Sequence, residues 1–392
     1  MNIYIFLAFT LLLTFLIGRL VEKIRVPWIF AALLIGFLLA IYNPFPSATS
    51  SETFEFLAHL GMYSLLFMVG FELDFIELKK LGKFIFKATF FIICLEALFG
   101  TLLVHFVFGY NWFVSFLVAM SFATVGEAIL LPILDEFKIV NTKLGQSIIG
   151  IGTLDDIIEV SVLILVIFLL SPEKNPNAHI ALVIASLLAL ILLIYGLRWL
   201  KKKSHKFAFL QIESLFLFVL VILFLFIGAG KFAHASAIAA LLAGLSVKNF
   251  LPAERIELIE SEVRTMCYGF FAPLFFIWVG ITMDITYLAT YPMLVLLVIF
   301  VSKGAKLLGS YIVAKKELGT KQSILLGIGL SVRFSTSIII IKILFENGLI
   351  GSDLYSVIVA SSIAFKFIIP ILFANLLLRW KIPVDYKNKT IM

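Results

Sequence analysis

The sequence predicts an all-α integral membrane protein with about 13 transmembrane helices, because stretches long and apolar enough to cross a bilayer follow one another along the chain. Hydrophobic residues make up 62% of its 392 positions and charged residues 14%, and mean hydropathy is +1.12. Soluble domains are about half apolar and about a quarter charged. So much apolar surface requires lipid as its solvent.

A transmembrane helix needs about 20 mostly apolar residues, and this length divides the chain into expected spans. In chain order they are 2–21, 27–43, 53–72, 84–108, 112–134, 143–171, 178–198, 207–228, 232–248, 257–283, 286–314, 319–345 and 350–379. The connectors between them are short. We therefore expect a single membrane domain over residues 1–392, without a soluble regulatory domain.

Basic residues mark alternate connectors and the C-terminal tail. They are Lys23 and Arg25; Lys79, Lys80 and Lys83; Lys138; Arg198, Lys201, Lys202, Lys203 and Lys206; Arg255; Lys315 and Lys316; and Arg379, Lys381, Lys387 and Lys389. By the positive-inside rule, this alternation predicts an N-terminus outside, a cytoplasmic C-terminus and an odd number of helices in the cell membrane. The net charge of +7 thus indicates membrane orientation and no nucleic-acid partner.

Two adjacent acids, Asp155 and Asp156, lie inside the expected span 143–171. A charge at this depth costs at least about 2.5 kcal/mol, so such residues are functional candidates by default. Two neighbouring carboxylates in apolar surroundings do not both ionise without a cation or a basic partner. One of them therefore holds a proton while the site is empty and releases it when a cation binds. This competition is the basis of proton-coupled exchange, and a structural ion pair or a cavity lining is the alternative.

Several other ionisable residues fall inside expected spans. Glu159 shares a helix face with the two aspartates, and it is either an accessory acid or a hydrogen-bonding group for a neighbouring helix. Lys303, Lys306, Arg333 and Lys366 are basic residues within the later spans. Each is a potential partner for the acids or a side chain that extends to the membrane interface.

Two apolar stretches carry polar interruptions. Thr124, Gly126 and Glu127 interrupt the span 112–134, and Arg333 and Ser335 lie in the second interruption, 327–337. Broken transmembrane helices expose backbone carbonyls, and a pair of them in the two halves of a chain indicates a transporter site. We expect Thr124 and the opened carbonyls to complete the coordination of a cation.

The remaining polar residues point to no other chemistry. Glu96, His105, Glu213 and His234 are isolated, and each is expected to be a packing or interfacial group. The sequence contains no phosphate-binding loop, no nucleophile–base arrangement and no histidine–cysteine cluster. We therefore expect no enzymatic activity, no cofactor and no structural metal.

Three motifs, together with Asp155–Asp156, carry a family resemblance. They are R-x-P…G over 25–36, G-x-x-x-L-L-F-x-x-G-x-E-x-D over 61–74 and F-x-P-x-F-F…G…D over 271–284. With these motifs the sequence resembles the second family of monovalent cation:proton antiporters, which includes NapA-like and Kef-like exchangers. The aspartate pair is typical of the NapA-like members.

The resemblance implies a homodimer whose moving core contains two crossed, partly unwound helices and gives alternating access by an elevator-like displacement. It implies inverted repeats, one over about 1–171 and one over about 207–380, joined by a linking helix near 178–198 and followed by the tail 381–392.

The same resemblance implies the roles of the site residues. Asp156 would be the principal ligand of the monovalent cation, and Asp155 would pair with Lys306 or with nearby Lys303. The sequence departs from the family near Arg333, which is followed by Phe334 and Ser335, and at Glu127, where relatives usually have an apolar or hydroxyl residue.

Exchange of Na⁺ or Li⁺ for protons is therefore the predicted function. Exchange of K⁺ by the same fold, sodium-coupled symport of an organic anion, and a sensor that does not transport are the alternatives. Ion preference and proton stoichiometry depend on ligand number and cavity size, which the sequence leaves open.

Overall fold

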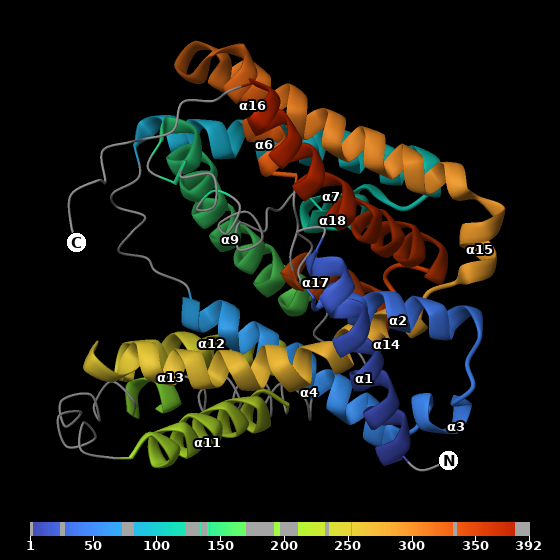
Figure 1. Ribbon diagram of the computed structural model, residues 1–392, viewed down its shortest axis with the longest axis vertical. Helices are drawn as coiled ribbons and strands as arrows, with labels where there is room; N and C mark the ends of the chain where they lie inside the picture. The colour runs from blue at the N-terminus through green and yellow to red at the C-terminus, as the bar shows by residue number, and fades with distance from the viewer. Residues whose placement is uncertain are drawn as a thin grey trace. The chain divides into compact units, whose positions relative to one another are not determined.

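The computed structural model describes residues 3–23, 28–72, 82–122, 134, 139–140, 142–169, 192–196, 211–231, 235–251, 253–331 and 335–380, and these contain helices and connectors but no strand. The helices are α1 (Ile3–Glu22), α2 (Phe30–Ile41), α3 (Pro46–Thr49), α4 (Glu52–Glu72), α6 (Lys83–Phe108), α7 (Trp112–Phe122), α9 (Lys143–Leu169), α11 (Ile212–Lys231), α12 (Ser236–Phe250), α13 (Ala253–Met266), the π-helix η2 (Cys267–Phe271), α14 (Ala272–Ile281), α15 (Ile285–Thr290), α16 (Pro292–Gly329), α17 (Ser335–Glu346) and α18 (Ser352–Trp380). Figure 1 draws these helices and labels most of them.

Several predicted spans are confirmed within a few residues. The stretches predicted at 53–72, 84–108 and 350–379 correspond to α4, α6 and α18. Within the described residues, six helical stretches are long and apolar enough to cross a membrane. The predicted linking helix 178–198 lies outside the described residues except for 192–196, which are helical.

The predicted division between the spans 286–314 and 319–345 is confirmed at Gly319, although the first of these spans contains two helices. A short helix, α15, comes first, and Tyr291 leaves the helical conformation before Pro292 begins α16. Helix α16 then continues to Gly329 with a kink at Gly319, where φ is +77°. Glycine adopts this positive φ at no steric cost, so the chain folds back there and brings Gly327 against Leu307. The second interruption is narrower than expected, because α17 starts at Ser335.

The chain forms two compact units that do not follow chain order. Unit 1 contains Met1–Leu11, Asn43–Leu73 and Leu163–Val279, and unit 2 contains Leu12–Tyr42, Asp74–Val162 and Gly280–Met392. Each unit draws segments from both halves of the sequence. The repeats expected at about 1–171 and 207–380 remain a prediction.

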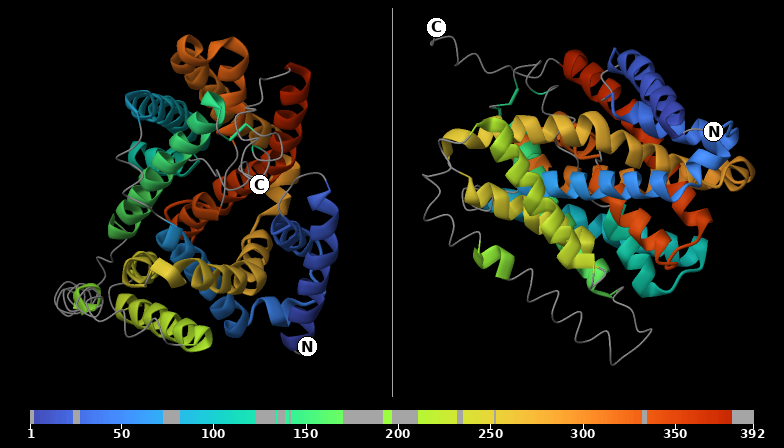
Figure 2. Two further views of the ribbon diagram at one scale, coloured as in Figure 1. Left: turned by 60° about the vertical axis from the view of Figure 1, so that its left-hand side comes forward. Right: turned by 90° about the horizontal axis from the view of Figure 1, so that it is seen from below.

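Close helix contacts at glycines hold unit 1 together. Helices α4 and α12 lie side by side (Figure 2). A Cβ atom at Gly70 would overlap the carbonyl oxygen of Leu241, and one at Gly244 would overlap that of Phe67. Without a hydrophobic driving force in lipid, membrane helices associate through such close backbone packing. The G-x-x-x-L-L-F…G motif is therefore in part a packing motif.

A π-helix interrupts the α13–α14 helix immediately before Pro273. The Ala272 N–H bonds the carbonyl of Cys267, five residues earlier. Proline lacks an N–H, and its ring clashes with the carbonyl four residues before it, so a local widening accommodates it. The carbonyl of Phe271 lies so close to Gly61 of α4 that no Cβ would fit there. Two of the family-like motifs thus pack on each other.

Unit 2 is built around α6, α16 and α18. Helix α16 packs against both α6 and α18, and Leu103, Val298 and Val357 from these three helices form one buried cluster. Gly280, at the start of this unit's last segment, packs backbone to backbone against Gly36 of α2. Gly36 and Gly280, the glycines of the other two motifs, therefore form a second close backbone contact.

We predict that Gly70→Ala destabilises the protein by about 1–3 kcal/mol, since the added methyl group overlaps backbone that cannot easily move. Thermal unfolding in detergent measures this as a lower melting temperature. Gly228→Ala in α11 is the matched control, because a Cβ there meets nothing within 4 Å. Equal melting temperatures for both variants would contradict the proposed role of the α4–α12 contact.

Candidate functional site

Helix α9 carries the predicted acid pair at the centre of a long apolar segment. Asp155 is fully buried, and Glu159, one turn later, is 5% exposed. Asp156 belongs to the same helix, but its side chain lies outside the described part of the structure. Burial of Asp155 places a carboxylate in surroundings where a charge needs a partner or a proton.

A second buried acid, Glu96 on α6, is joined to Lys306 on α16. The Lys306 Nζ lies 3.0 Å from Glu96 Oε2, with both side chains completely buried. Ser302, four residues before Lys306 and therefore on the same helix face, donates a hydrogen bond to Glu96 Oε1 at 2.8 Å. The sequence analysis predicts that Glu96 is an isolated group that packs between helices. Glu96 does connect two helices, but it does so through a buried ion pair.

This pair bears on the expected partner of Asp155. The lysine that the family resemblance assigns to Asp155 lies against Glu96, whereas the alternative, Lys303, is 7% exposed one turn earlier on α16. Neither lysine extends to a surface. An ammonium has three donors and can serve more than one acceptor, so the pairing of Lys306 with Asp155 stays a prediction.

The crossing of the two interrupted helices is described only at its edges. Thr124, Glu127 and Arg333 lie outside the described residues. Ser335 is the first residue of α17, but its side chain is not among those described, and the same holds for Lys366 on α18. Their predicted roles remain predictions.

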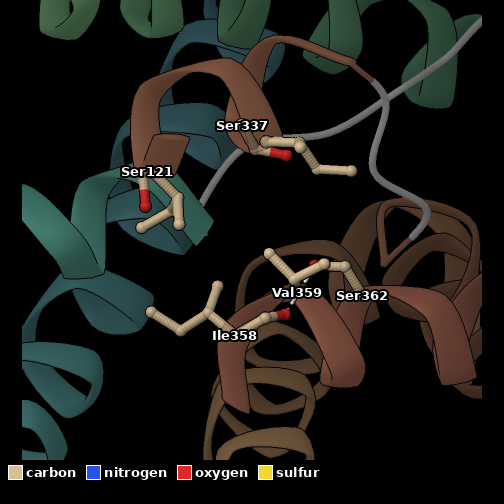
Figure 3. Close-up of a pocket in the computed structure, with 7 residues that line it drawn as sticks. Ser121, Ser337, Ile358, Val359 and Ser362 are labelled. Carbon is tan, nitrogen blue, oxygen red and sulfur yellow. Dashed lines mark hydrogen bonds between the residues drawn. The ribbon is translucent and has the colours of Figure 1, made fainter. Parts of the chain in front are cut away.

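A small pocket lies beside these edges within unit 2. It is lined by Ser121, Ser337, Ile338, Ile341, Ile358, Val359 and Ser362. Figure 3 shows Ser121 and Ser337 on one side and Ser362 on the other. Ser121 is close to the first expected interruption and Ser337 follows the second, so hydroxyl groups gather next to both.

One end of unit 2 is fastened by Tyr110, in the connector between α6 and α7. Its hydroxyl accepts a hydrogen bond from the Gly351 N–H at 2.7 Å and lies 3.3 Å from Asp353 Oδ1. Burial raises the pKa of the Tyr110 phenol, and Asp353 raises it further against the lowering effect of the Gly351 hydrogen bond. Tyr110 therefore stays protonated and donates to Asp353 at neutral pH.

The sequence analysis missed one intramembrane lysine. Lys342 lies in α17 and is 1% exposed, with its Nζ 3.0 Å from Thr282 Oγ1. The signal was present in the sequence, since Lys342 interrupts the apolar stretch 338–344.

Unit 2 thus contains every described candidate of the ion site. A buried acid on α9, a buried ion pair between α6 and α16 and a pocket with three serines all belong to it. Carboxylate, hydroxyl and carbonyl oxygens are the ligands that hard cations prefer. A buried carboxylate near such oxygens can hold either a cation or a proton.

Known proteins share the sequence pattern and the fold. A family profile described as sodium/hydrogen exchanger, transmembrane, matches residues 9–379. A probable Na⁺/H⁺ antiporter 3 of Methanocaldococcus jannaschii is 28% identical over 376 residues, 95% of this chain and 96% of that protein. The glutathione-regulated potassium-efflux system protein KefC of Enterobacter is 27% identical over 280 residues, 68% of this chain and 43% of KefC. The sodium proton antiporter MjNhaP1 of Methanocaldococcus jannaschii has the same fold, with a TM-score of 0.64 over 97% of this chain and 96% of that one at 18% identity.

We predict that Glu96→Gln destabilises the protein by about 3–5 kcal/mol, because it removes the carboxylate that faces a buried ammonium. Thermal unfolding in detergent provides the measurement. Glu213→Gln is the matched control, since Glu213 is exposed on α11.

A double variant, Glu96→Met with Lys306→Met, sharpens this prediction. Replacing both members of a buried ion pair by apolar residues is often neutral or stabilising. We therefore expect the double variant to be more stable than Glu96→Gln. A double variant that is no more stable would argue against the ion pair as the source of the loss.

Proposed function

The chain belongs to the family of transmembrane sodium/hydrogen exchangers, and on that premise we propose that it exchanges Na⁺ or Li⁺ for protons at Asp155 and Asp156. One observation carries the proposal, namely the burial of Asp155 in α9 directly before a second aspartate. Proton and cation would compete for these carboxylates, so that binding of one releases the other. As a transporter, the protein would have these ions as its substrates.

Asp156 would be the residue that alternates between proton and cation. Asp155 would add the second charge that makes the empty site take up a proton, since adjacent carboxylates repel each other in apolar surroundings. Thr124 and backbone carbonyls at the two interruptions would complete the cation's oxygen shell. Glu159 would be an accessory acid, because it is buried one turn away on the same helix.

Alternating access would come from an elevator-like displacement of unit 2, the unit that contains the acids. The division of the chain into two compact units supports this, because the described site candidates all fall in one of them. We further propose a homodimer in the cell membrane, with the N-terminus outside and the C-terminus cytoplasmic. The alternation of basic connectors supports that orientation.

The contact between Lys306 and Glu96 affects the proton count. If Lys306 also pairs with Asp155 and gives up its proton when a cation binds, the cycle exchanges more than one proton per cation and is electrogenic. If Lys306 remains paired with Glu96, only the aspartates supply protons. The observed 3.0 Å contact supports the second scheme.

Potassium is the second candidate ion. The similarity of this chain to a glutathione-regulated potassium-efflux protein over 68% of its length favours this alternative. Glu127 would then be the first residue to replace, because an additional acid near the crossing changes the number and charge of the ligands.

We predict that Na⁺ and Li⁺ drive proton movement in proteoliposomes that contain a trapped pH dye, and that Asp156→Asn abolishes this movement while the protein stays folded. Asparagine keeps the size of aspartate but cannot exchange a proton. Glu257→Gln, an exposed acid on α13, is the control and should leave transport unchanged. Cation-driven proton movement in Asp156→Asn would refute the proposed site, and a response to K⁺ alone would favour potassium exchange.

The double variant Glu96→Met, Lys306→Met is predicted to retain sodium-driven proton movement with the proton count of the original protein. The reason is that Lys306 is balanced by Glu96, so removal of both leaves the charge at the aspartates unchanged. Reversal-potential measurements in the same proteoliposomes give the count. If the folded double variant instead exchanges fewer protons per cation, the proton of Lys306 takes part in the transport cycle.

A further inference from the structure

Lys342 is a buried cation that the proposed exchange mechanism does not use. It lies in α17, the helix that follows the second interruption, and is 1% exposed. Ionisable residues at membrane depth are costly and are retained where they have a function. The contacts of Lys342 indicate what that function is.

Three side chains from three parts of unit 2 meet at Lys342. Its Nζ donates to Thr282 Oγ1 at 3.0 Å, and the Thr282 hydroxyl lies 3.0 Å from the hydroxyl of Tyr355 on α18. The ammonium also lies 5.3 Å from the ring centre of Phe345 and 5.5 Å from that of Tyr355. Aromatic faces within about 6 Å attract a cation. Thr282 belongs to the turn between α14 and α15.

This network is next to the serine-lined pocket and involves the same two helices. Ile341 of α17 and Ile358 of α18 line the pocket. Lys342 directly follows Ile341, and Tyr355 precedes Ile358 by one turn. Phe345 and Tyr355 stack with ring centres 4.5 Å apart. The network therefore fixes the spacing of α17 and α18 where the two helices enclose the pocket (Figure 3).

Two of the three pocket serines donate their hydrogens within their own helices. Ser121 donates its hydrogen to the carbonyl of Val118 at 2.6 Å, and Ser362 donates to that of Ile358 at 3.0 Å. A serine that donates its one hydrogen within its own helix can interact with any further group only through its oxygen. Hydroxyl oxygens suit a hard cation or its hydrating water, and the spacing of Ser337 from the other two serines depends on how α17 is held.

We propose that Lys342, Thr282 and Tyr355 form a positioning network that fixes α17 against α18 and thereby sets the apparent affinity for Na⁺. The inference rests on the proposed exchange function and adds residues to its site. Lys342 acts through the position of α17 and the pocket serines, without contact to the transported ion.

The test compares Thr282→Val and Tyr355→Phe with Thr290→Val and Tyr291→Phe. Thr290 ends α15 and Tyr291 follows it, and both side chains are exposed, so the same chemical changes are made outside the network. Sodium-driven proton movement is measured in proteoliposomes as apparent KM and maximal rate. A hydrogen bond lost in the network should raise KM for Na⁺ about three- to tenfold, with the maximal rate within about twofold.

A double variant and a binding measurement provide further tests. Thr282 bridges Lys342 and Tyr355, so Thr282→Val combined with Tyr355→Phe should have little more effect than the larger single effect, because coupled residues are not additive. Sodium binding should raise the melting temperature in NaCl above that in choline chloride. This difference should be smaller in Thr282→Val than in the unaltered protein, and it should be unchanged in Thr290→Val.

The outcomes separate this inference from the proposed function. If the unaltered protein moves no protons with any cation, the proposed exchange function itself is wrong. If the unaltered protein is active but Thr282→Val and Tyr355→Phe leave the KM for Na⁺ unchanged, the positioning network alone is overturned. A lower melting temperature and rate with unchanged KM would also overturn it, since a purely structural role predicts that pattern.

Discussion

The complete burial of Glu96 and Lys306 is the constraint that the packing of unit 2 has to satisfy. Two charges without exposure to water are stable only when they face each other with good geometry, and the 3.0 Å contact meets that condition. It fixes α6 against the first part of α16. Gly309, nearly one turn beyond Lys306, packs on the backbone of Ile92, so the ion pair and the close helix contact enforce the same register.

The second interrupted helix is held on both sides of its break. Before the break, Gly327 packs on Leu307, the residue after Lys306. After the break, Lys342 ties α17 to Thr282 and, through it, to Tyr355. A broken helix in a membrane leaves backbone groups without helical partners and is tolerated only where protein or a cavity surrounds it. The buried lysines Lys306 and Lys342 therefore lie where the segments before and after the break are held.

Unit 1 is held by different means. Its contacts come from glycines that allow backbones to touch and from a π-helix that accommodates Pro273. No ion pair as deeply buried as Glu96–Lys306 is found among the described residues of this unit, where Arg264 and Glu72 meet at 2.9 Å with both side chains partly exposed. Unit 2 combines close glycine contacts with the buried Glu96–Lys306 pair, and it contains the acids of the proposed site.

The sequence alone determined the helical membrane class, several spans and the acid pair of α9, because hydropathy and a charge at membrane depth are local properties of about 20 residues. It also showed where the second helix breaks, with bounds a few residues too wide. Only the tertiary structure decided which partner each charge has. Glu96 and Ser302 are 206 positions apart, and Lys342 and Thr282 are 60 positions apart. Partners this distant meet through helix packing, which no local pattern encodes.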